Sequence, residues 1–141
     1  MMQKWYPYKT QKIPAAAENF SLIASNVTRK GQGCFLFANK KAMKLIICEE
    51  FYQTELDLPS LDFDYQIVDL FSDGRVLIAD RRSRWRNTED FDLNAAVITP
   101  DQQSVERFHI GDGITKIALD ALDRIWVSYS YFCIIRLYVI V

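Results

Sequence analysis

The stretch that decides the fold is Ser72-Asp73-Gly74-Arg75-Val76-Leu77-Ile78-Ala79-Asp80. A turn signal leads into a short, continuous apolar run with a polar boundary after it, which is typical of a buried β-strand entered from a hairpin. Two other stretches follow the same pattern: Gly33-Cys34-Phe35-Leu36-Phe37-Ala38 and Asp123-Arg124-Ile125-Trp126-Val127-Ser128. When the three stretches are aligned with Gly33, Gly74 and Asp123 at the same position, their apolar residues fall at the same positions. The chain is therefore predicted to contain an internal repeat.

Short runs of β-branched and aromatic residues continue along the chain, separated by turn signals roughly every eight to twelve residues. No segment has a sustained helical period, so the sequence predicts an all-β protein. The expected strands cover residues 21–27, 34–39, 43–50, 52–58, 65–71, 75–80, 94–100, 104–110, 114–120, 124–129 and 132–141.

The spacing and the strand composition together indicate the architecture. A repeat of roughly forty to fifty residues that holds four short strands is typical of a β-propeller blade. The continuous apolar runs indicate sheets covered on both faces, as when blades stack around an axis. We therefore predict an incomplete β-propeller of antiparallel four-stranded blades. A β-sandwich is the alternative, although its strands would alternate more cleanly between apolar and polar residues.

The predicted blades occupy most of the chain. Residues 1–18 have a basic bias, two prolines and no sustained period, and are expected to form an irregular lead-in. Residues 19–60 and 61–110 are predicted to form two blades, and residues 111–141 part of a third.

The stretch from Tyr65 to Tyr129 resembles blades of bacterial propeller proteins of the NHL and lyase-like kind, and the resemblance covers somewhat under half of the chain. It rests on the repeat segments quoted above together with Asn94-Ala95-Ala96-Val97, Pro100-Asp101 and Phe108-His109-Ile110-Gly111-Asp112-Gly113-Ile114. In such families the phrase Asp-Gly-Arg-Ile-Trp-Val closes the turn between the first two strands of a blade. Here Asp123 stands where that phrase has glycine. The resemblance implies architecture more than function, because similar blades occur in lyases, lactonases and interaction scaffolds.

The predicted blades are too few for a closed ring, since propellers close with about four to eight. The chain runs into the apolar stretch 132–141 where the resembling proteins continue into further blades, which suggests a truncation or a frame change. Open blade faces and unpaired edge strands predict self-association.

Composition and charge exclude several classes of partner. Among the 141 residues, 17 basic side chains stand against 18 acidic ones, so no nucleic-acid or membrane partner is expected. Cys34, Cys48 and Cys133 lack a CxxC spacing, and we expect free thiols rather than a disulfide. No signal peptide is recognisable at the start of the sequence, and a cytoplasmic location is predicted.

One segment stands out as a candidate ligand-binding site. Four arginines and a tryptophan fall within six residues, a composition that could hold a carboxylate or phosphate and stack a ring. The alternative is an ion-paired loop neutralised by the acids that follow it. The candidate ligand-binding residues are Arg81, Arg82, Arg84, Trp85 and Arg86, and the neutralising acids are Glu89, Asp90 and Asp92.

No catalytic, cofactor or metal site is predicted. His109 is the only histidine. Lyase-like propellers use a histidine as general acid or base, but a hydrogen-bonded histidine at a strand end is the simpler interpretation. Lactonase-type propellers hold a divalent ion with side chains from several blades around the axis. The side chains with the right chemistry here are Asp69, Asp80, Asn94 and Asp120. We do not expect them to form such a set, because too few blades are present to surround an axis.

Two functions are therefore compatible with the sequence. The first is a non-catalytic binding module whose protein or small-molecule ligand contacts the loops of one face, with Arg84, Trp85 and Arg86 as anchors. The second is the remnant of a propeller enzyme, a lyase or lactonase, with an incomplete active site.

Overall fold

The computed structural model describes residues 18–61, 64–102, 104–131 and 134–140, and the prediction of an all-β chain is confirmed over these ranges. Three antiparallel sheets contain most of the strands. Sheet one holds β1 (Ser21–Val27), β2 (Gly33–Ala38), β3 (Met43–Cys48) and β4 (Gln53–Leu58). Sheet two holds β5 (Ile67–Leu70), β6 (Val76–Ala79), β9 (Ala95–Ile98) and β10 (Val105–Phe108). Sheet three holds β11 (Ile114–Leu119), β12 (Ile125–Tyr131) and β13 (Ile134–Ile140).

Within each of these sheets the strands follow one another as an antiparallel meander. Between β6 and β9 the chain leaves sheet two and forms a separate two-stranded hairpin, β7 (Trp85–Asn87) and β8 (Asp90–Phe91). Every expected run contains a strand, and the last expected run begins and ends outside the described residues. The predicted lead-in, residues 1–18, lies outside the described part of the chain except for Glu18.

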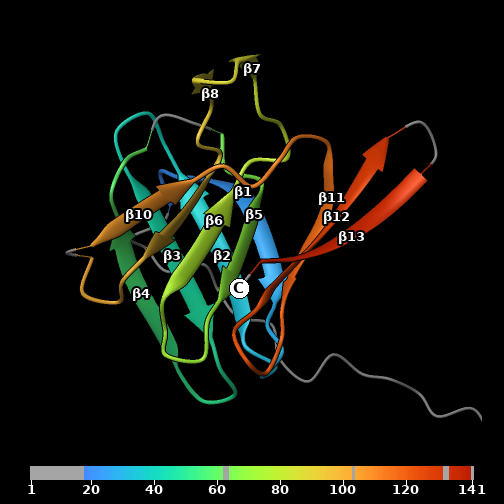
Figure 1. Cartoon of the computed structure of the whole chain (residues 1–141). Helices are drawn as coiled ribbons and strands as arrows, with labels where there is room; N and C mark the ends of the chain where they lie inside the picture. The colour runs from blue at the N-terminus through green and yellow to red at the C-terminus, as the bar shows by residue number, and fades with distance from the viewer. Residues whose placement is uncertain (1–17, 62–63, 103, 132–133, 141) are drawn as a thin grey trace, which may run out of the picture.

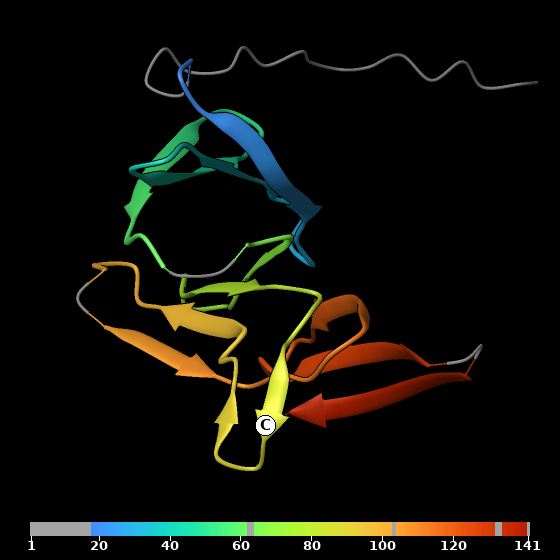
Figure 2. The same cartoon turned by 90° about the horizontal axis from the view of Figure 1, so that it is seen from above.

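The three sheets stack in chain order, as Figure 2 shows from above. Their first strands lie next to one another, β1 beside β5 and β5 beside β11. In Figure 1 the β7–β8 hairpin projects at one end of the stacked sheets, and the β1–β2, β5–β6 and β11–β12 turns lie at the opposite end. The β7–β8 hairpin and the three first turns therefore lie at opposite ends of the molecule.

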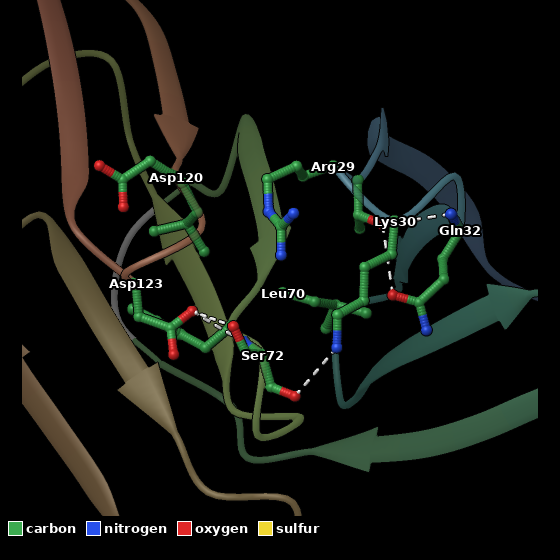
Figure 3. Close-up of a pocket in the computed structure, with 10 residues that line it drawn as sticks. Arg29, Lys30, Gln32, Leu70, Ser72, Asp120 and Asp123 are labelled. Carbon is green, nitrogen blue, oxygen red and sulfur yellow. Dashed lines mark hydrogen bonds between the residues drawn. The ribbon is translucent and has the colours of Figure 1, made fainter.

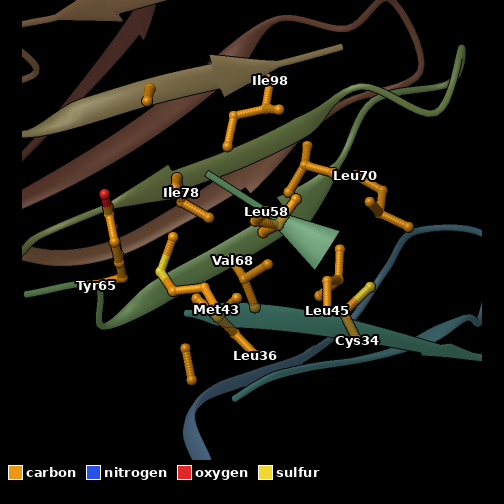
Figure 4. Packing of buried hydrophobic residues seen from close by; sticks show 13 residues of the cluster. Cys34, Leu36, Met43, Leu45, Leu58, Tyr65, Val68, Leu70, Ile78 and Ile98 are labelled. Atoms are coloured by element: carbon orange, nitrogen blue, oxygen red, sulfur yellow. The ribbon is translucent and has the colours of Figure 1, made fainter. Parts of the chain in front are cut away.

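One hydrophobic cluster joins sheet one to sheet two (Figure 4). Leu36 and Leu45 from sheet one and Val76, Ile78 and Ile98 from sheet two have no measurable exposure. Full burial of a side chain of this size stabilises the fold by about 1.5–3 kcal/mol. The interface is therefore a main source of stability.

A second cluster joins sheet two to sheet three, with Leu77 and Ala79 packed among residues that include Ile117, Leu119 and Val127. Because Val76 and Ile78 face sheet one while Leu77 and Ala79 face sheet three, β6 is buried on both faces. This arrangement explains the continuous apolar run Val76-Leu77-Ile78-Ala79.

The internal repeat is present, but one of its predicted alignments is wrong by two residues. The turns between the first two strands of each sheet close with the same hydrogen bonds, in which Gly31, Gly74 and Asp123 donate to Thr28, Phe71 and Asp120. Gly31, not Gly33, is therefore the equivalent of Gly74. All three residues have a positive φ, +80° and +88° at the glycines and 58° at Asp123. Aspartate tolerates this conformation better than most residues, which explains why Asp123 replaces glycine without loss of the turn.

The thiols at Cys34 and Cys48 are free, as predicted, and Cys133 lies outside the described residues. Cys34 belongs to the cluster between sheets one and two, whereas Cys48 packs in a small cluster with Phe37 and Ile46. Burial raises the pKa of the Cys34 thiol to about 12, with Asp69 and Cys48 adding to the effect.

Candidate functional site

The arginine-rich segment is irregular over residues 81–84, as expected of a loop, and continues into a β-hairpin whose first strand holds Trp85 and Arg86. Trp85 pairs with Phe91 and Asn87 with Asp90, with an irregularity in the register between the two pairs. The Asn87 side chain accepts a hydrogen bond from the backbone N–H of Glu89 and closes the turn. The alternation of polar and aromatic residues on either side of Asn87 was the sequence signal for this hairpin.

The buried side chain of Asn94 anchors the base of the hairpin. Its Nδ2 donates to the carbonyl oxygens of Asp80 at 3.1 Å and Gly111 at 2.8 Å, and lies 3.4 Å from that of Arg82. Its Oδ1 accepts from the backbone N–H of Ile110 at 3.1 Å. The Asn94 amide therefore links the start of the segment between β6 and β9, called the excursion below, to the loop between β10 and β11.

Further hydrogen bonds close the two strands of the excursion against each other. The backbone N–H of Asp92 donates to the carbonyl of Arg84 at 3.0 Å, and the Arg84 N–H donates to the Asp92 carboxylate at 2.9 Å. The backbone N–H of Ser83 donates to the Asp112 carboxylate at 2.8 Å. The hairpin thus projects from a base that is held at several points.

Three of the five predicted ligand-binding residues are engaged within the protein. Arg81 donates through its side chain to the backbone carbonyls of Ile114 and Thr115. Arg82 lies 3.3 Å from the Asp112 carboxylate. These two arginines attach the excursion to the neighbouring loop and to sheet three.

The third, Arg86, forms ion pairs with Asp90 at 2.7 Å and Asp92 at 3.0 Å. The hydrogen bonds to these carboxylates raise the pKa of the Arg86 guanidinium. The pKa of Asp92 is lowered, first by the backbone N–H of Arg84 and then by Arg86. Part of the predicted alternative, a segment neutralised by its own acids, is therefore present.

Arg84 differs from the other arginines. In the described part of the chain, no ion pair or side-chain hydrogen bond involves its guanidinium. It lines an open hollow of about 380 Å³ together with Asp80, Arg82, Ser83, Arg86 and Asp92.

Trp85 lies on the other side of the hairpin from the paired charges. Residues directly opposite each other in an antiparallel pair project to the same side, so the Trp85 and Phe91 side chains share one side of the hairpin. Trp85 does not line the hollow, and 63% of its surface is exposed. The structure therefore does not bring Trp85 together with Arg84 and Arg86, the three residues expected to act as joint anchors.

The ring of His109 packs against Phe91, with ring centroids 4.9 Å apart. Its Nδ1 lies 3.1 Å from the carbonyl oxygen of Asp92 and 3.1 Å from the hydroxyl of Ser83. No serine is adjacent to His109 in the sequence; two separate loops bring Ser83 and His109 together. A carbonyl oxygen can only accept, so Nδ1 carries the proton, and Nε2 holds the free lone pair.

The Ser83–His109 contact does not have the geometry of an activated nucleophile. The Ser83 hydroxyl also lies 3.2 Å from the Asp92 carbonyl, to which it donates. With Nδ1 protonated, His109 cannot take a proton from Ser83 at this contact. Ser83 is also buried, with 7% of its surface exposed.

The side chains that suggested metal chemistry form hydrogen bonds within the protein. Asp69 accepts from the N–H groups of Leu70 and Leu119, and Asp80 accepts from that of Arg82. Asp120 accepts from Trp126 Nε1 at 2.8 Å, and this hydrogen bond is the main reason that its pKa is strongly lowered. The described residues contain no group of three or more His, Cys, Asp or Glu side chains placed to hold a metal ion.

At the opposite end of the stack, the three equivalent turns meet around a cavity of about 10 Å³ (Figure 3). Lys30 donates to the Ser72 carbonyl at 3.3 Å, and the Ser72 hydroxyl donates to Asp123 at 2.7 Å. A volume of this size holds at most one water molecule. These turns lock to one another and leave no room for a ligand.

No protein-family model matches the chain, and no curated protein is significantly similar to it. Within the described residues, no helix has the length and apolar character needed to cross a membrane.

Proposed function

We propose that this protein is a non-catalytic binding module whose ligand, a protein or a small molecule, contacts the β7–β8 hairpin. The observation that carries the proposal is the placement of Trp85. A large aromatic side chain that is 63% exposed stands on a hairpin held by Asn94 and by the Ser83–Asp92 contacts. Aromatic and arginine side chains on preorganised elements contribute most of the energy in binding interfaces.

The scaffold is proposed to be a set of consecutive β-propeller blades of the NHL or lyase-like kind. Support comes from the repeated first turn of each sheet, from the burial of β6 on both faces, and from the adjacency of β1, β5 and β11. In a propeller the first strands of successive blades lie around the axis. A two-layer sandwich offers no equivalent reason for three successive sheets to share one turn geometry.

The role of the arginines in the binding proposal is secondary. Arg81 and Arg86 are used within the hairpin and its base, whereas Arg84 and the exposed part of Arg82 line the adjacent hollow. A ligand that covers Trp85 and reaches around the hairpin edge would meet Arg84 as a second contact. Because acids neutralise most of the arginines, a nucleic acid or an anionic membrane is not the proposed partner.

Two further proposals concern context. The strands β4 and β10 lie at the edges of their sheets with a partner strand on one side only, which supports self-association through unpaired blade edges. A reducing compartment such as the cytoplasm is proposed because the Cys34 and Cys48 thiols are free.

The enzyme alternative retains one favourable observation, the 3.1 Å contact between Ser83 and His109. A serine hydrolase would react covalently with a fluorophosphonate probe at its nucleophile. We expect no labelling of Ser83 in the folded protein, because its hydroxyl donates to a carbonyl. Labelling that is lost in Ser83→Ala would favour the enzyme.

The binding proposal is tested with binders selected against the folded chain from a random peptide library and a small-molecule fragment library. Trp85→Ala should weaken the selected binders at least tenfold, and the triple variant Arg84→Ala, Trp85→Ala, Arg86→Ala should abolish binding. Arg75→Ala, at the opposite end of the stack, serves as the matched control and should leave binding unchanged. Binders that are indifferent to Trp85→Ala and to the triple variant would refute the proposal.

A further inference from the structure

Three aromatic side chains, Trp85, Phe91 and His109, follow one another on one side of the hairpin, through a strand pairing and a ring contact. Trp85 pairs across the strands with Phe91, and the Phe91 ring packs on the imidazole of His109. Trp85 and His109 are exposed, and Phe91 between them is half-buried. This row, Trp85–Phe91–His109, therefore has two ends that a ligand can reach.

The imidazole at the end of this row is fixed in orientation. Its Nδ1 is held by the Asp92 carbonyl and lies beside the Ser83 hydroxyl, both at 3.1 Å, while its ring packs on Phe91. No group among the described residues forms a hydrogen bond with Nε2. With the proton on Nδ1, Nε2 is a hydrogen-bond acceptor and can be satisfied by a hydroxyl or N–H of a ligand.

The charged groups lie elsewhere on the hairpin. Arg86 is paired with Asp90 and Asp92, and these side chains line or adjoin the hollow that excludes Trp85. A ligand on the aromatic row therefore meets rings and a neutral acceptor rather than a concentration of positive charge.

We propose that the row Trp85–Phe91–His109 binds a neutral carbohydrate, a choice of ligand class that rests on the proposed binding function. One face of a pyranose ring presents C–H groups with partial positive charge, which suit the electron-rich face of an indole. A hydroxyl of the same or the next sugar unit donates to Nε2 of His109.

Two other ligand classes that stack on aromatic rings fit less well. Proline-rich peptides dock on aromatic grooves through their carbonyls, which need donors from the protein, whereas His109 offers an acceptor. Nucleotides bring phosphate charge, but Arg82 and Arg86 are paired with acids, and Arg84 lines the hollow, of which Trp85 is not part. A neutral ligand rich in hydroxyl groups satisfies both features of the row.

The test is a calorimetric and NMR titration of the full chain with maltotriose, cellotriose, mannotriose, galactotriose and triacetylchitotriose, each up to about 10 mM. At least one sugar should bind with a dissociation constant of about 0.1–1 mM, as weak single-site contacts do. Trp85→Ala should lower the affinity at least tenfold. His109→Phe retains an aromatic ring that can pack against Phe91 but lacks the acceptor Nε2. This variant should lower the affinity several-fold. Arg75→Ala, at the far end of the stack, is the control and should bind normally.

Decaproline and adenosine monophosphate are titrated in parallel. Failure of all five sugars to bind, or binding that survives Trp85→Ala, overturns the carbohydrate proposal. If decaproline or the nucleotide binds instead and depends on Trp85, the ligand class is wrong while the binding function of the hairpin stands. If selected peptides and fragments are also indifferent to Trp85, the binding function fails as well. Circular dichroism of each variant establishes that a loss of binding is not a loss of fold.

Discussion

Asn26 and Asp69 occupy equivalent positions in the first strands of consecutive sheets, and each forms a hydrogen bond with the first strand of the next sheet. Asn26 Nδ2 donates to the carbonyl of Val68 at 3.1 Å, and Asp69 accepts from the N–H of Leu119 at 3.3 Å. Their equivalence follows from the shared turn geometry and from the strand pairing, in which Asn26 is opposite Cys34 and Asp69 is opposite Leu77. The same position in sheet three is Ala118, which is exposed.

Removing the first of these bonds should weaken the contact between sheets one and two. We expect Asn26→Ala to reduce the free energy of unfolding by about 1 kcal/mol, since it removes one partly buried hydrogen bond. Urea denaturation followed by circular dichroism measures the change. Ser25→Ala, at the exposed neighbouring position, is the control. Equal stability of the two variants would show that the Asn26 contact contributes nothing.

Asp69 should make stability depend on pH. Burial raises its pKa above the usual value of 3.8, and the N–H groups of Leu70 and Leu119 only partly oppose this effect. Because the folded state favours the protonated acid, the contribution of Asp69 is most favourable below pH 3.8 and declines as the pH rises through the folded-state pKa. The difference in unfolding free energy between the native chain and Asp69→Asn should therefore shift against the native chain as pH rises from about 3.5 to 7. A difference that is constant with pH would contradict the assignment.

Asn94 should matter more to stability than any other polar residue of the hairpin base. Asn94→Ala leaves several buried backbone groups without their partner and is expected to cost about 2–4 kcal/mol. Asn94→Asp places a carboxylate against the carbonyls of Asp80 and Gly111 and should destabilise the fold at neutral pH more than at acid pH. Thermal unfolding at pH 4 and pH 7 measures both effects. An Asn94→Ala variant that unfolds at the same temperature as the native chain would show that the hydrogen bonds of Asn94 do not contribute to stability.

Gly111 should not tolerate a side chain. Its φ is +108°, and an added Cβ would lie 2.5 Å from the ring of Tyr129. Gly31 also has a positive φ, but a Cβ there would meet nothing within 4 Å. We expect Gly31→Ala to cost about 1 kcal/mol from backbone strain alone and Gly111→Ala to cost clearly more. Chemical denaturation of the pair tests this order, and equal losses would mean that Tyr129 moves away at no cost.

The two described cysteines should differ in reactivity. Cys34 has no exposed surface and a pKa raised to about 12, whereas Cys48 is only half-buried. Iodoacetamide at pH 8 should label Cys48 of the native chain well before Cys34, because the thiolate is the reactive form and must be reached. Peptide mapping by mass spectrometry resolves the two sites. Fast labelling of Cys34 without unfolding would contradict its buried position.

The strands could be predicted from the sequence because burial leaves a direct trace in it. β6 lies between two sheets, and its four residues are all apolar for that reason. The exact alignment of the repeat could not be predicted in the same way. Shifting the first copy by two residues keeps alternate side chains on the same face, so the apolar columns match in either register. Only the positive φ of Gly31 and its turn hydrogen bond distinguish the two alignments.

The candidate site was located by its composition, but its internal arrangement was not. Arg84, Trp85 and Arg86 are consecutive, but Arg84 and Arg86 line the hollow and Trp85 does not, a division that composition alone does not show. The approach of His109 to Ser83 and Phe91 depends on the Asn94 network, which joins two loops distant in the sequence. No local pattern encodes such a contact.

The central claim is that ligands contact the hairpin through Trp85, and an NMR fragment screen of the isotope-labelled chain tests it most directly. A panel of neutral, anionic and aromatic fragments is added to the native protein, with the indole signal of Trp85 assigned by comparison with Trp85→Phe. The account predicts that binding fragments shift the Trp85 indole N–H and the backbone signals of residues 83–94. Shifts that gather elsewhere, or no shifts with any fragment, would contradict it.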